Sequence, residues 1–471
     1  MDDRDLQAQL ESLRRRNERL EAELERVLQA APCATSVAAA VLNLVDDLLE
    51  GEAPTAQQLI TIREQVRTSR VMWGAYDLKA AIRAECQDAD VAENLIALLA
   101  TRDAETKTET AVTTLGEIAT ARSSRRASLD LVRVSSSLPL TDHTEAILRT
   151  ASQWQWNAFD LRDATGDKPL SCLAFWVFQH AGLVDHFSLQ VGPLCAFLRR
   201  VEQGYADHPY HNRTHVADVL QTVFKCLTSG GMPVTKEDML VCFLAAIVHD
   251  FEHTGLTNDF LVATEHPLAI VYNDYSPHEN HHASAAWKLV TRPEYDFLPD
   301  KSRRAVIRHA MIELVLATDM RNHFTILNQF TNRFNLIEDY GGRSSTSPNQ
   351  PDYRASLLPD LDEKKLLLQV LLKASDLSHL SATHAVHVRW VTLLEREFFA
   401  QGDLEKQLGL EVTPLFDRAK GGVTKSQVSF FDIVGAPLFA ALTAVAQDTS
   451  PLLTAVMANR NAWAGHPRTD P

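Results

Sequence analysis

Two apolar runs that each lead into an aspartate constrain this chain more than any other feature of its sequence. The run Met239–Val248 leads directly into His249 and Asp250. Because this run is apolar on every face of a helix, the helix should be deeply buried. A second apolar run, Leu366–Leu372, leads to Asp376. An unpaired buried carboxylate is very costly, so each aspartate needs a cation as its partner. The sequence therefore predicts two buried helices that end at a shared metal site.

Histidines are concentrated in the same part of the chain. Fourteen of the 18 histidines lie between His208 and His387. Within this region two pairs of histidines have the spacing i, i+4: His211 with His215, and His249 with His253. On a helix, this spacing would place the two rings of each pair on the same face. A single pair of this kind is typical of ordinary core histidines. Two pairs, coinciding with two buried aspartates, favour a site for zinc or a harder divalent ion. Such sites usually catalyse hydrolysis.

Length, charge and cysteine content limit the remaining possibilities. A chain of 471 residues can form two or three domains. Its formal net charge of −15 argues against a general nucleic-acid binder. It permits a small anionic substrate, because bound metal ions would reverse the local field. The six cysteines form no CxxC pair, which fits a reducing compartment. Cys226 and Cys242 lie in apolar sequence and are predicted to be buried free thiols.

The N-terminal segment has the pattern of a coiled coil rather than of a signal peptide. Over residues 1–31, one set of apolar residues recurs every seven positions and suits the heptad position d: Leu6, Leu13, Leu20 and Val27. A second set suits position a: Leu10, Asn17 and Leu24. Leucine at d with one asparagine at a favours a parallel two-stranded coiled coil, and hence a homodimer. A solitary amphipathic helix is the alternative.

The rest of the chain divides by composition into three regions, and an all-α fold is expected throughout. Residues 32–118 form a helical regulatory region, interrupted by a turn at 51–55. Residues 119–140 are a polar, Ser/Arg-rich linker, and residues 141–465 are helical with a flexible loop at 341–351. We judged no run long and apolar enough to span a bilayer. The expectation is a cytoplasmic protein without a membrane span.

Residues 141–465 closely resemble the catalytic domain of the class I 3',5'-cyclic nucleotide phosphodiesterases. The resemblance is carried by seven motifs: Tyr210-His211-Asn212-x-x-His215-x-Ala217-Asp218-Val219; His249-Asp250-x-Glu252-His253-Thr254-Gly255-x-Thr257-Asn258; Tyr272-Asn273-Asp274 with Glu279-Asn280-His281-His282; Leu316-Ala317-Thr318-Asp319-Met320; Asp376-Leu377-Ser378-His379; Glu397-Phe398-Phe399-x-Gln401-Gly402-Asp403; and Ser426-Gln427-Val428-x-Phe430. It implies a compact multi-helix domain of the HD type.

Within that family the chain is most similar to the calmodulin-dependent, dual-specificity branch. The similarity is carried by His253-Thr254-Gly255, by His379 and by Leu408-Gly409-Leu410. Two residues depart from the pattern of this branch. Leu380 stands where proline is usual, and Ser429 stands where glycine is usual. Both are expected to border the nucleotide pocket.

The resemblance implies a two-metal hydrolase. It implies that four residues bind the tighter metal ion, which would be zinc: His215, His249, Asp250 and Asp376. Asp250 would also bridge to a second ion, magnesium or manganese. A hydroxide activated by both cations would attack the cyclic phosphate of cAMP or cGMP. His211 would protonate the departing O3′ and so release a 5'-monophosphate. Three further residues are expected to orient the metal ligands and bound waters: His253, Glu279 and Asp319. Simple helix packing is the alternative for these three.

The purine base would occupy an apolar slot. By resemblance, Phe430 and Leu394 clamp the ring and Gln427 hydrogen-bonds its edge. The glutamine amide offers a donor and an acceptor, so it suits adenine or guanine if it can rotate. Tyr210 and His379 would line the same pocket. Without the resemblance, such residues are more simply interpreted as core.

Two regulatory features remain hypotheses. Arg125-Arg126-Ala127-Ser128-Leu129 matches the substrate pattern of cAMP-dependent protein kinase, with Ser128 as the phosphosite. An ordinary Ser/Arg linker is the alternative. Residues 60–83 combine five basic residues with Trp73 and could bind calmodulin as an amphipathic helix. Simple packing of that helix is the alternative.

Two other functions compete with cyclic nucleotide hydrolysis. A related His-Asp scaffold could hydrolyse nucleoside mono- or triphosphates, but Gln427 and Phe430 argue against it. A dimeric nucleotide sensor without catalysis would not need His211 and all four metal ligands. Hydrolysis of a cyclic nucleotide is therefore the leading hypothesis.

Overall fold

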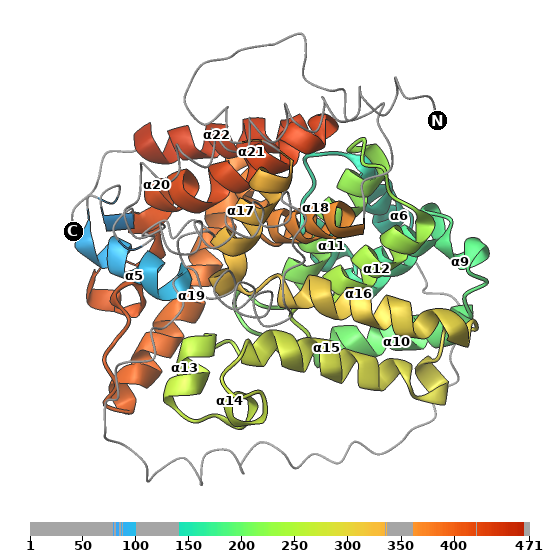
Figure 1. Ribbon diagram of the computed structural model, residues 1–471, viewed down its shortest axis with the longest axis horizontal. Helices are drawn as coiled ribbons and strands as arrows, with labels where there is room; N and C mark the ends of the chain where they lie inside the picture. The colour runs from blue at the N-terminus through green and yellow to red at the C-terminus, as the bar shows by residue number, and fades with distance from the viewer. Residues whose placement is uncertain are drawn as a thin grey trace, which may run out of the picture. The chain divides into compact units, whose positions relative to one another are not determined.

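The computed structural model describes residues 79, 82–83, 86, 88–99, 141–334, 336, 361–420 and 422–465, and no strand occurs among them. The described helices belong to one compact unit, Ile82–Pro471 (Figure 1). The predicted all-α fold of residues 141–465 is confirmed there. Four predictions lie outside the described residues: the coiled coil at 1–31, most of the regulatory region, the linker with Ser128, and the loop at 341–351.

The described segments contain α-helices, short 3-10 helices and one π-helical stretch. Before residue 300 they are α5 (Ala89–Leu99), α6 (Asp142–Arg149), η1 (Thr150–Ser152), α7 (Ala158–Ala164), α8 (Pro169–His180), α9 (Leu183–His186), α10 (Val191–Gly204), α11 (Arg213–Ser229), α12 (Lys236–Val248), α13 (Asn258–Ala263), α14 (Pro267–Val271), α15 (Pro277–Val290) and η2 (Pro293–Tyr295). After residue 300 they are η3 (Lys301–Arg303), α16 (Arg304–Leu316), η4 (Met320–Asn322), α17 (His323–Arg333), α18 (Leu361–Asp376), η6 (Ser378–Ser381), α19 (His384–Gln407), η7 (Pro414–Phe416), η8 (Arg418–Lys420), η9 (Val423–Ser426), α20 (Gln427–Phe430), η10 (Phe431–Gly435), α21 (Ala436–Val445), η11 (Gln447–Thr449) and α22 (Ser450–Gly465).

Helices α11 and α12 lie at the centre of the core. Helix α11 packs against α8, α12 and α18, and α12 packs against α16 (Figure 1). A capping box between Thr235 and Asp238 starts α12. From Leu240 to Val248 every residue of α12 is buried, so the prediction of a deeply buried helix before His249 is confirmed.

Helix α18 is the second predicted buried helix. Its residues from Leu367 to Ser375 are buried, and it ends at Asp376. Because α18 packs against α11 and α12, its last residue comes close to the end of α12. Both predicted carboxylates therefore lie where two core helices end.

The predicted helical placement of the two histidine pairs is wrong. His211 precedes α11, because Asn212 is its N-cap and accepts hydrogen bonds from the main-chain N–H groups of Thr214 and His215. In the second pair, His249 is the C-cap of α12 and His253 lies in the following turn. One histidine of each pair therefore lies outside the helix, so its ring does not share a helix face with the ring of its partner.

By length and composition, one helical segment of the described residues could cross a membrane. It is Val423–Val445, and 44% of the apolar 18-residue window within it is buried. The expectation that no such run exists is therefore wrong on this test. The segment comprises η9, α20, a π-helical stretch (η10) and α21, and α21 packs against α17, α18 and α22. A core helix of a folded domain passes the same test, and the packing accounts for its apolar character.

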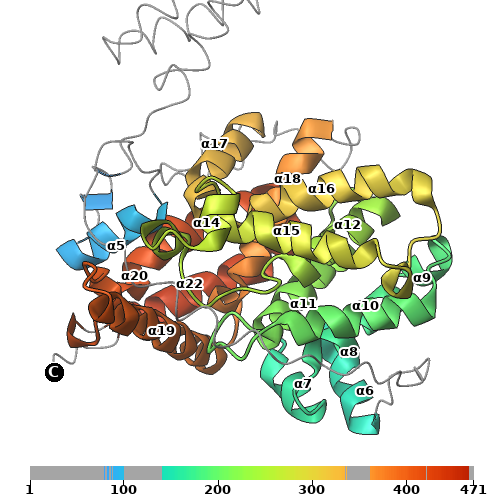
Figure 2. The same ribbon diagram turned by 90° about the horizontal axis from the view of Figure 1, so that it is seen from below.

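Helix α5 comes from the predicted regulatory region but packs with the helices that follow residue 141. It contacts η4 and η7 and lies beside α19 and α20 in both views (Figures 1 and 2). Its apolar face is buried: Val91, Ala92, Leu95, Ile96 and Leu99. Two ion pairs reinforce the contact, Asp88–Lys425 at 2.5 Å and Asp90–Lys420 at 3.3 Å.

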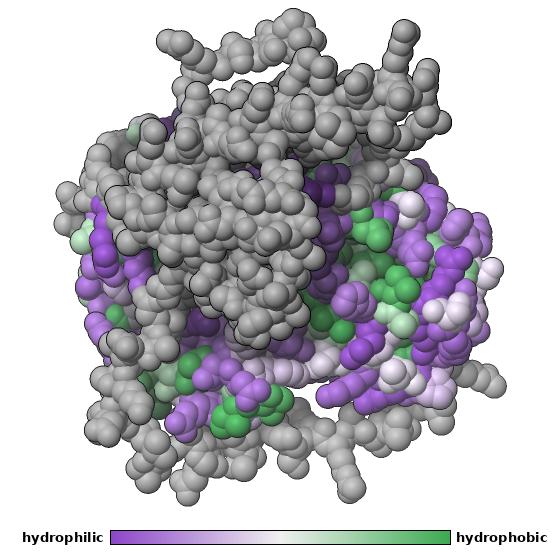
Figure 3. Space-filling model, in the orientation of Figure 1, coloured by the Kyte–Doolittle hydropathy of each residue, from purple (hydrophilic) through white to green (hydrophobic). Residues whose placement is uncertain are grey.

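Two further groups of apolar residues differ in their exposure to solvent. Cys226 and Cys242 are buried free thiols, as predicted. On the surface, hydrophobic side chains gather over α14 (Figure 3), where Ile270 and Val271 are 63% and 65% exposed. Nothing in the described residues covers them.

Candidate metal centre and nucleotide pocket

Four of the predicted site residues converge from three separate parts of the chain. They are His215 in α11, His249 and Asp250 at the end of α12, and Asp376 at the end of α18. One ligand atom from each lies within 4.8 Å of the others. The predicted metal-ligand set is therefore brought together by the fold.

The hydrogen bonds around this cluster fit a metal ion. His249 Nδ1 lies 2.9 Å from the main-chain oxygen of Ala246. Since a carbonyl can only accept, Nδ1 carries the proton, and the lone pair of neutral His249 is on Nε2. That Nε2 lies 3.2 Å from Asp376 Oδ1, and His215 Nε2 lies 3.1 Å from the same oxygen. Asp250 Oδ2 is buried without a hydrogen-bond partner. A shared cation satisfies all of these lone pairs.

The electrostatics of the cluster lead to the same conclusion. Burial alone would raise the pKa of Asp250 and Asp376, but His249 holds both pKa values below their usual range. Burial would lower the pKa of His249, whereas the two aspartates raise it well above its usual value. The cluster therefore attracts positive charge strongly. Bound metal would replace the proton on His249, because a ligating imidazole must be neutral.

A second group of carboxylates lies beside the cluster. Burial and the neighbouring Asp319 raise the pKa of Glu279 to about 8. Asn258 Nδ2 donates to Glu279 Oε2 at 3.0 Å, and Ser276 Oγ donates to Asp319 Oδ2 at 2.6 Å. Both carboxylates line the same cavity as Asp250. The raised pKa means that Glu279 resists ionising beside Asp319 when no cation is close by. A second, harder cation with oxygen ligands would favour the ionised carboxylates, so the pair suits such an ion.

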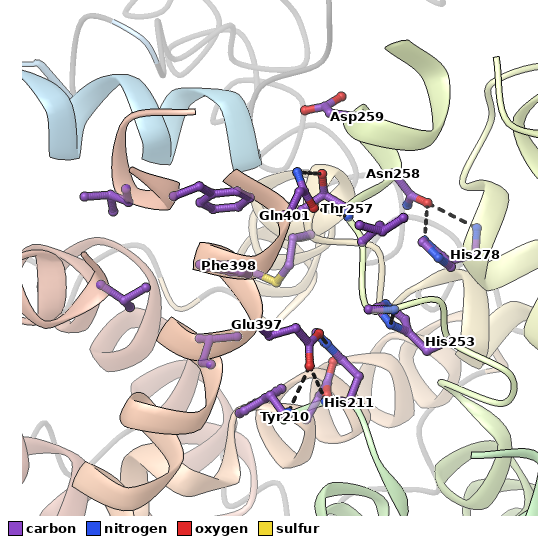
Figure 4. A pocket seen from close by; sticks show the side chains of 18 of the residues that line it. Tyr210, His211, His253, Thr257, Asn258, Asp259, His278, Glu397, Phe398 and Gln401 are labelled. Atoms are coloured by element: carbon purple, nitrogen blue, oxygen red, sulfur yellow. Dashed lines mark hydrogen bonds and ion pairs between the residues drawn. The ribbon is translucent and has the colours of Figure 1, made fainter. Parts of the chain in front are cut away.

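His211 is paired with a carboxylate instead of belonging to the four-ligand cluster. Its Nδ1 makes a very short hydrogen bond with Glu397 Oε1 (Figure 4). Glu397 Oε2 accepts from the main-chain N–H groups of Tyr210 and His211 at 2.9 and 3.1 Å. Burial would lower the pKa of His211, but Glu397 raises it to about 9. His211 is therefore held as an imidazolium near neutral pH, as a general acid requires.

His253 lies against the His211 ring. The two imidazoles stack with centroids 4.0 Å apart, and His253 stacks on His278 at 4.4 Å. Burial and the charge of His211 keep the pKa of His253 well below its usual value. A neutral His253 can thus lie against the charged His211, and Figure 4 shows both rings at the cavity.

One cavity joins the metal cluster to the predicted base-binding residues. It is lined by all five of the latter: Tyr210, His379, Leu394, Gln427 and Phe430. The same cavity is lined by the site residues His211, Asp250, His253, Glu279, Asp319 and Asp376. His215 and His249 are buried behind it. A ligand in this cavity could touch Gln427 and the carboxylates at once.

Gln427 has a definite orientation in this cavity. Its Nε2 donates to the main-chain oxygen of Val423 at 3.2 Å, whereas its buried Oε1 has no partner. Rotating the amide would place Oε1 against the Val423 oxygen. Because two acceptors repel each other, the amide keeps Nε2 on Val423 and leaves Oε1 as a buried acceptor without a protein partner.

Sequence reasoning missed two residues of this site. Glu397 stands in a quoted motif, but its spacing shows no link to His211, 186 residues earlier. Leu95 of α5 also lines the cavity, and no signal in the sequence points to it. The expectation that Leu380 and Ser429 border the pocket is wrong, since neither lines the cavity. Leu380 is fully buried and faces Gly435, so it acts through packing.

The described domain is helical, and one cavity brings imidazoles and carboxylates together with the apolar side chains of Leu394 and Phe430, an arrangement that suits a metal-dependent hydrolase. The sequence profile of the 3'5'-cyclic nucleotide phosphodiesterases matches residues 210–456, more than half of the chain. The chain therefore belongs to the 3'5'-cyclic nucleotide phosphodiesterase family. The matched range contains all the predicted metal ligands and His211.

Individual relatives agree with this assignment. The chain is 37% identical to the dual specificity calcium/calmodulin-dependent 3',5'-cyclic nucleotide phosphodiesterase 1 of Drosophila melanogaster, over 62% of this chain and 33% of that protein. It is 35% identical to phosphodiesterase 1B of Mus musculus over 64% of this chain and 53% of that protein. For phosphodiesterase 1C of the same species it is 35% identical, over 65% and 41%. The matched part spans between a third and about half of these relatives.

Proposed function

We propose that this chain hydrolyses the 3' phosphoester of cyclic nucleotides to give 5'-nucleoside monophosphates. The observation that supports this proposal most strongly is that Asp250, Asp376, Gln427 and Phe430 all line the same cavity. A cyclic nucleotide has both a phosphate for the carboxylate-bound cations and a purine for the slot. Membership of the family supports the same reaction.

The chain's own residues supply binding and proton transfer. When bound, two divalent cations would polarise the phosphate and lower the pKa of a water molecule. Glu397 holds His211 protonated and fixes its ring through Nδ1. His211 then donates the proton from Nε2 to the departing O3′, which leaves as a hydroxyl group. Phe430 and Leu394 hold the base on its two faces and exclude water from the slot.

The general-acid role of His211 is tested by His211→Ala. We expect kcat to fall by about 10²–10⁴-fold, the usual range for a lost general acid. Metal content, measured by mass spectrometry of the purified protein, should stay near that of the wild type because the four ligands are intact. A parallel loss of bound metal would remove His211 from this role.

We further propose that cAMP is preferred to cGMP. The free Oε1 of Gln427 can accept a hydrogen bond from the exocyclic amine of adenine. The corresponding group of guanine is itself an acceptor, so guanine would require the amide to rotate away from Val423. Losing that hydrogen bond inside a buried site costs about 1–3 kcal/mol.

The preference is measured as the ratio of kcat/KM for the two nucleotides. We expect cAMP to be favoured by about tenfold or more, because 1.4 kcal/mol corresponds to a factor of ten. Gln427→Ala should weaken both substrates and bring the ratio close to one. Equal kcat/KM values in the wild type, or an unchanged KM for both nucleotides in the variant, would contradict the proposal.

We propose zinc for the tighter site and magnesium or manganese for the second. Two imidazoles and two carboxylates suit zinc. The second half of the site offers mainly carboxylate oxygens, which suit a harder ion that keeps several waters. After exhaustive dialysis we expect about one zinc per chain to remain, and activity to return on adding Mg²⁺ or Mn²⁺. Full retention of two zinc ions would contradict this assignment.

Regulation is proposed on the sequence alone. We propose that residues 1–31 form a homodimeric coiled coil and that residues 60–83 bind calmodulin. We also propose that cAMP-dependent protein kinase phosphorylates Ser128, and that the protein is cytoplasmic. The relatives named above are calcium/calmodulin-dependent, which supports the second point. A calcium-dependent pull-down with residues 55–90, sedimentation of a 1–31 deletion and phosphorylation of the folded chain test the calmodulin, coiled-coil and kinase proposals separately.

A further inference from the structure

Lys373 is an unusual residue that the proposed mechanism does not use. It lies three residues before Asp376 in α18 and is only 2% exposed. Among the described residues it is the only buried lysine. Lysine is almost never fully buried without a partner, so the surroundings of this ammonium group need an explanation.

The partners of Lys373 are main-chain carbonyls at the end of another helix. Its Nζ donates to the oxygens of Ala317, Thr318 and Asp319 at 2.9, 3.4 and 3.4 Å. These residues follow directly after α16, which ends at Leu316. A cation at this point satisfies carbonyls that a helix leaves free at its C-terminus and interacts favourably with the helix dipole.

The carbonyls belong to the turn that presents Asp319 to the cavity. Thr318, Asp319 and Met320 all line it. The Asp319 carboxylate is also held from the other side, where Oδ2 accepts from Ser276 and Oδ1 accepts from the main-chain N–H of Arg321. Lys373 thus secures the main chain of a residue whose side chain lies in the second half of the metal site.

The charge of Lys373 lies behind an acidic group of residues. Asp376, Asp319 and Glu279 all raise its pKa, although burial outweighs them and lowers the pKa to about 8. Removing the lysine would therefore have two opposite effects on a cation bound in front. The site would become more negative, but the buried carbonyls of Ala317 and Thr318 would lose their donor, whereas the Asp319 oxygen would keep only the main-chain N–H of Asn322. Each unsatisfied carbonyl costs enough free energy to rearrange a turn.

We propose that Lys373 is a positioning residue: it fixes the turn Ala317–Asp319 so that Asp319 stays beside Glu279, and it thereby sets the affinity of the second, weaker cation site. The first site should depend on it much less, because three of its four ligands, His215, His249 and Asp250, are held by other elements and only Asp376 shares α18 with Lys373. This inference rests on the proposed two-cation site but not on the identity of the substrate.

The test measures binding of Mn²⁺ alone to the full chain after its metals have been removed. Isothermal titration and the electron paramagnetic resonance signal of free Mn²⁺ should resolve two classes of site in the wild type. In Lys373→Met, we expect the dissociation constant of the weaker class to rise about tenfold. The tighter class should change by less than about twofold. Lys365→Met is the matched control, since Lys365 is on the same helix but pairs with Glu313 at the surface.

Several results would overturn the inference. They are a single class of Mn²⁺ site in the wild type, an unchanged or tighter weak site in Lys373→Met, or an equal loss at both sites. If Lys373→Met does not fold, Lys373→Gln keeps a donor without the charge and should still weaken the second class by about threefold or more. An unchanged weak site in that variant would overturn the proposal as well. A wild type that binds two Mn²⁺ classes but hydrolyses no cyclic nucleotide would contradict the proposed function and leave this inference standing.

Discussion

At the scale of single residues, the pairing of His211 with Glu397 controls the protonation that the proposed general-acid role requires. The imidazole is buried, which by itself favours the neutral form, but the carboxylate reverses this and raises the pKa to about 9. His211 must be protonated to act as a general acid. Activity should therefore persist to alkaline pH and fall as the pH rises through that pKa.

Glu397→Gln should move this alkaline limit to lower pH. Without the carboxylate, burial lowers the pKa of His211, so the alkaline limb of the kcat profile should shift down by about one pH unit or more. From a pKa of about 9, a shift of about one unit would lower kcat at pH 8 about twofold, and a shift of about two units would lower it about tenfold. The measurement is a pH profile of kcat with saturating substrate and metal.

A neighbouring glutamate provides the control for this experiment. Glu395 is on the same helix but accepts from Thr424, away from His211. Glu395→Gln should leave the pH profile unchanged. If Glu397→Gln has the wild-type profile, the carboxylate does not govern the protonation of His211.

At the scale of elements, close helix contacts shape the wall of the pocket. Gly402 in the middle of α19 allows η7 to approach, because a Cβ there would clash with the main-chain oxygen of Phe416. Gly402→Ala should destabilise the fold by about 1–3 kcal/mol. Thermal unfolding should show a lower Tm. Gly192→Ala in α10, where no atom lies within 4 Å of the new Cβ, should be neutral or stabilising by up to ~1 kcal/mol. Equal Tm values for both variants would contradict the close approach.

The docking of α5 is the second contact that can be tested at this scale. Leu95 is 2% exposed and lines the cavity. Leu95→Asp would lose about 1.5–3 kcal/mol of apolar burial. Hydrogen exchange of residues 89–99 should therefore become fast while α11 and α12 keep their protection. Asp90→Ser should have little effect, because exposed ion pairs contribute about 0–1 kcal/mol. Unchanged protection in Leu95→Asp would show that Leu95 does not anchor α5.

At the scale of the whole molecule, the metal site joins distant parts of the chain. His215, Asp250 and Asp376 come from three helices, so a bound cation links these helices and relieves the repulsion between the two carboxylates. Removing metal with a chelator should lower Tm by several degrees, since a ligand present at about 100 times its Kd contributes about 2.7 kcal/mol. Adding zinc back should restore Tm. A Tm that is indifferent to chelation would contradict a metal in this cluster.

The core helices could be predicted because their burial follows from short stretches of the sequence. The runs before Asp250 and Asp376 are so apolar that only burial suits them, and the structure has both as core helices. The four predicted metal ligands and the predicted base-binding residues follow from the motifs, or for Leu394 from the family resemblance, and the fold brings them to one region. The error over the histidine pairs arose because spacing alone cannot distinguish a helix from its cap: Asn212 caps the start of α11, so His211 lies before the helix.

The sequence by itself determined the family, the buried helices and the set of candidate site residues, because these depend on composition and on short spacings. Only the tertiary structure decided how those residues are paired and oriented. Glu397 reaches His211 across 186 residues, Lys373 reaches the turn after α16, and Val423 turns the amide of Gln427. Such contacts depend on how separate helices pack, and buried polar groups must find their partners wherever that packing places them.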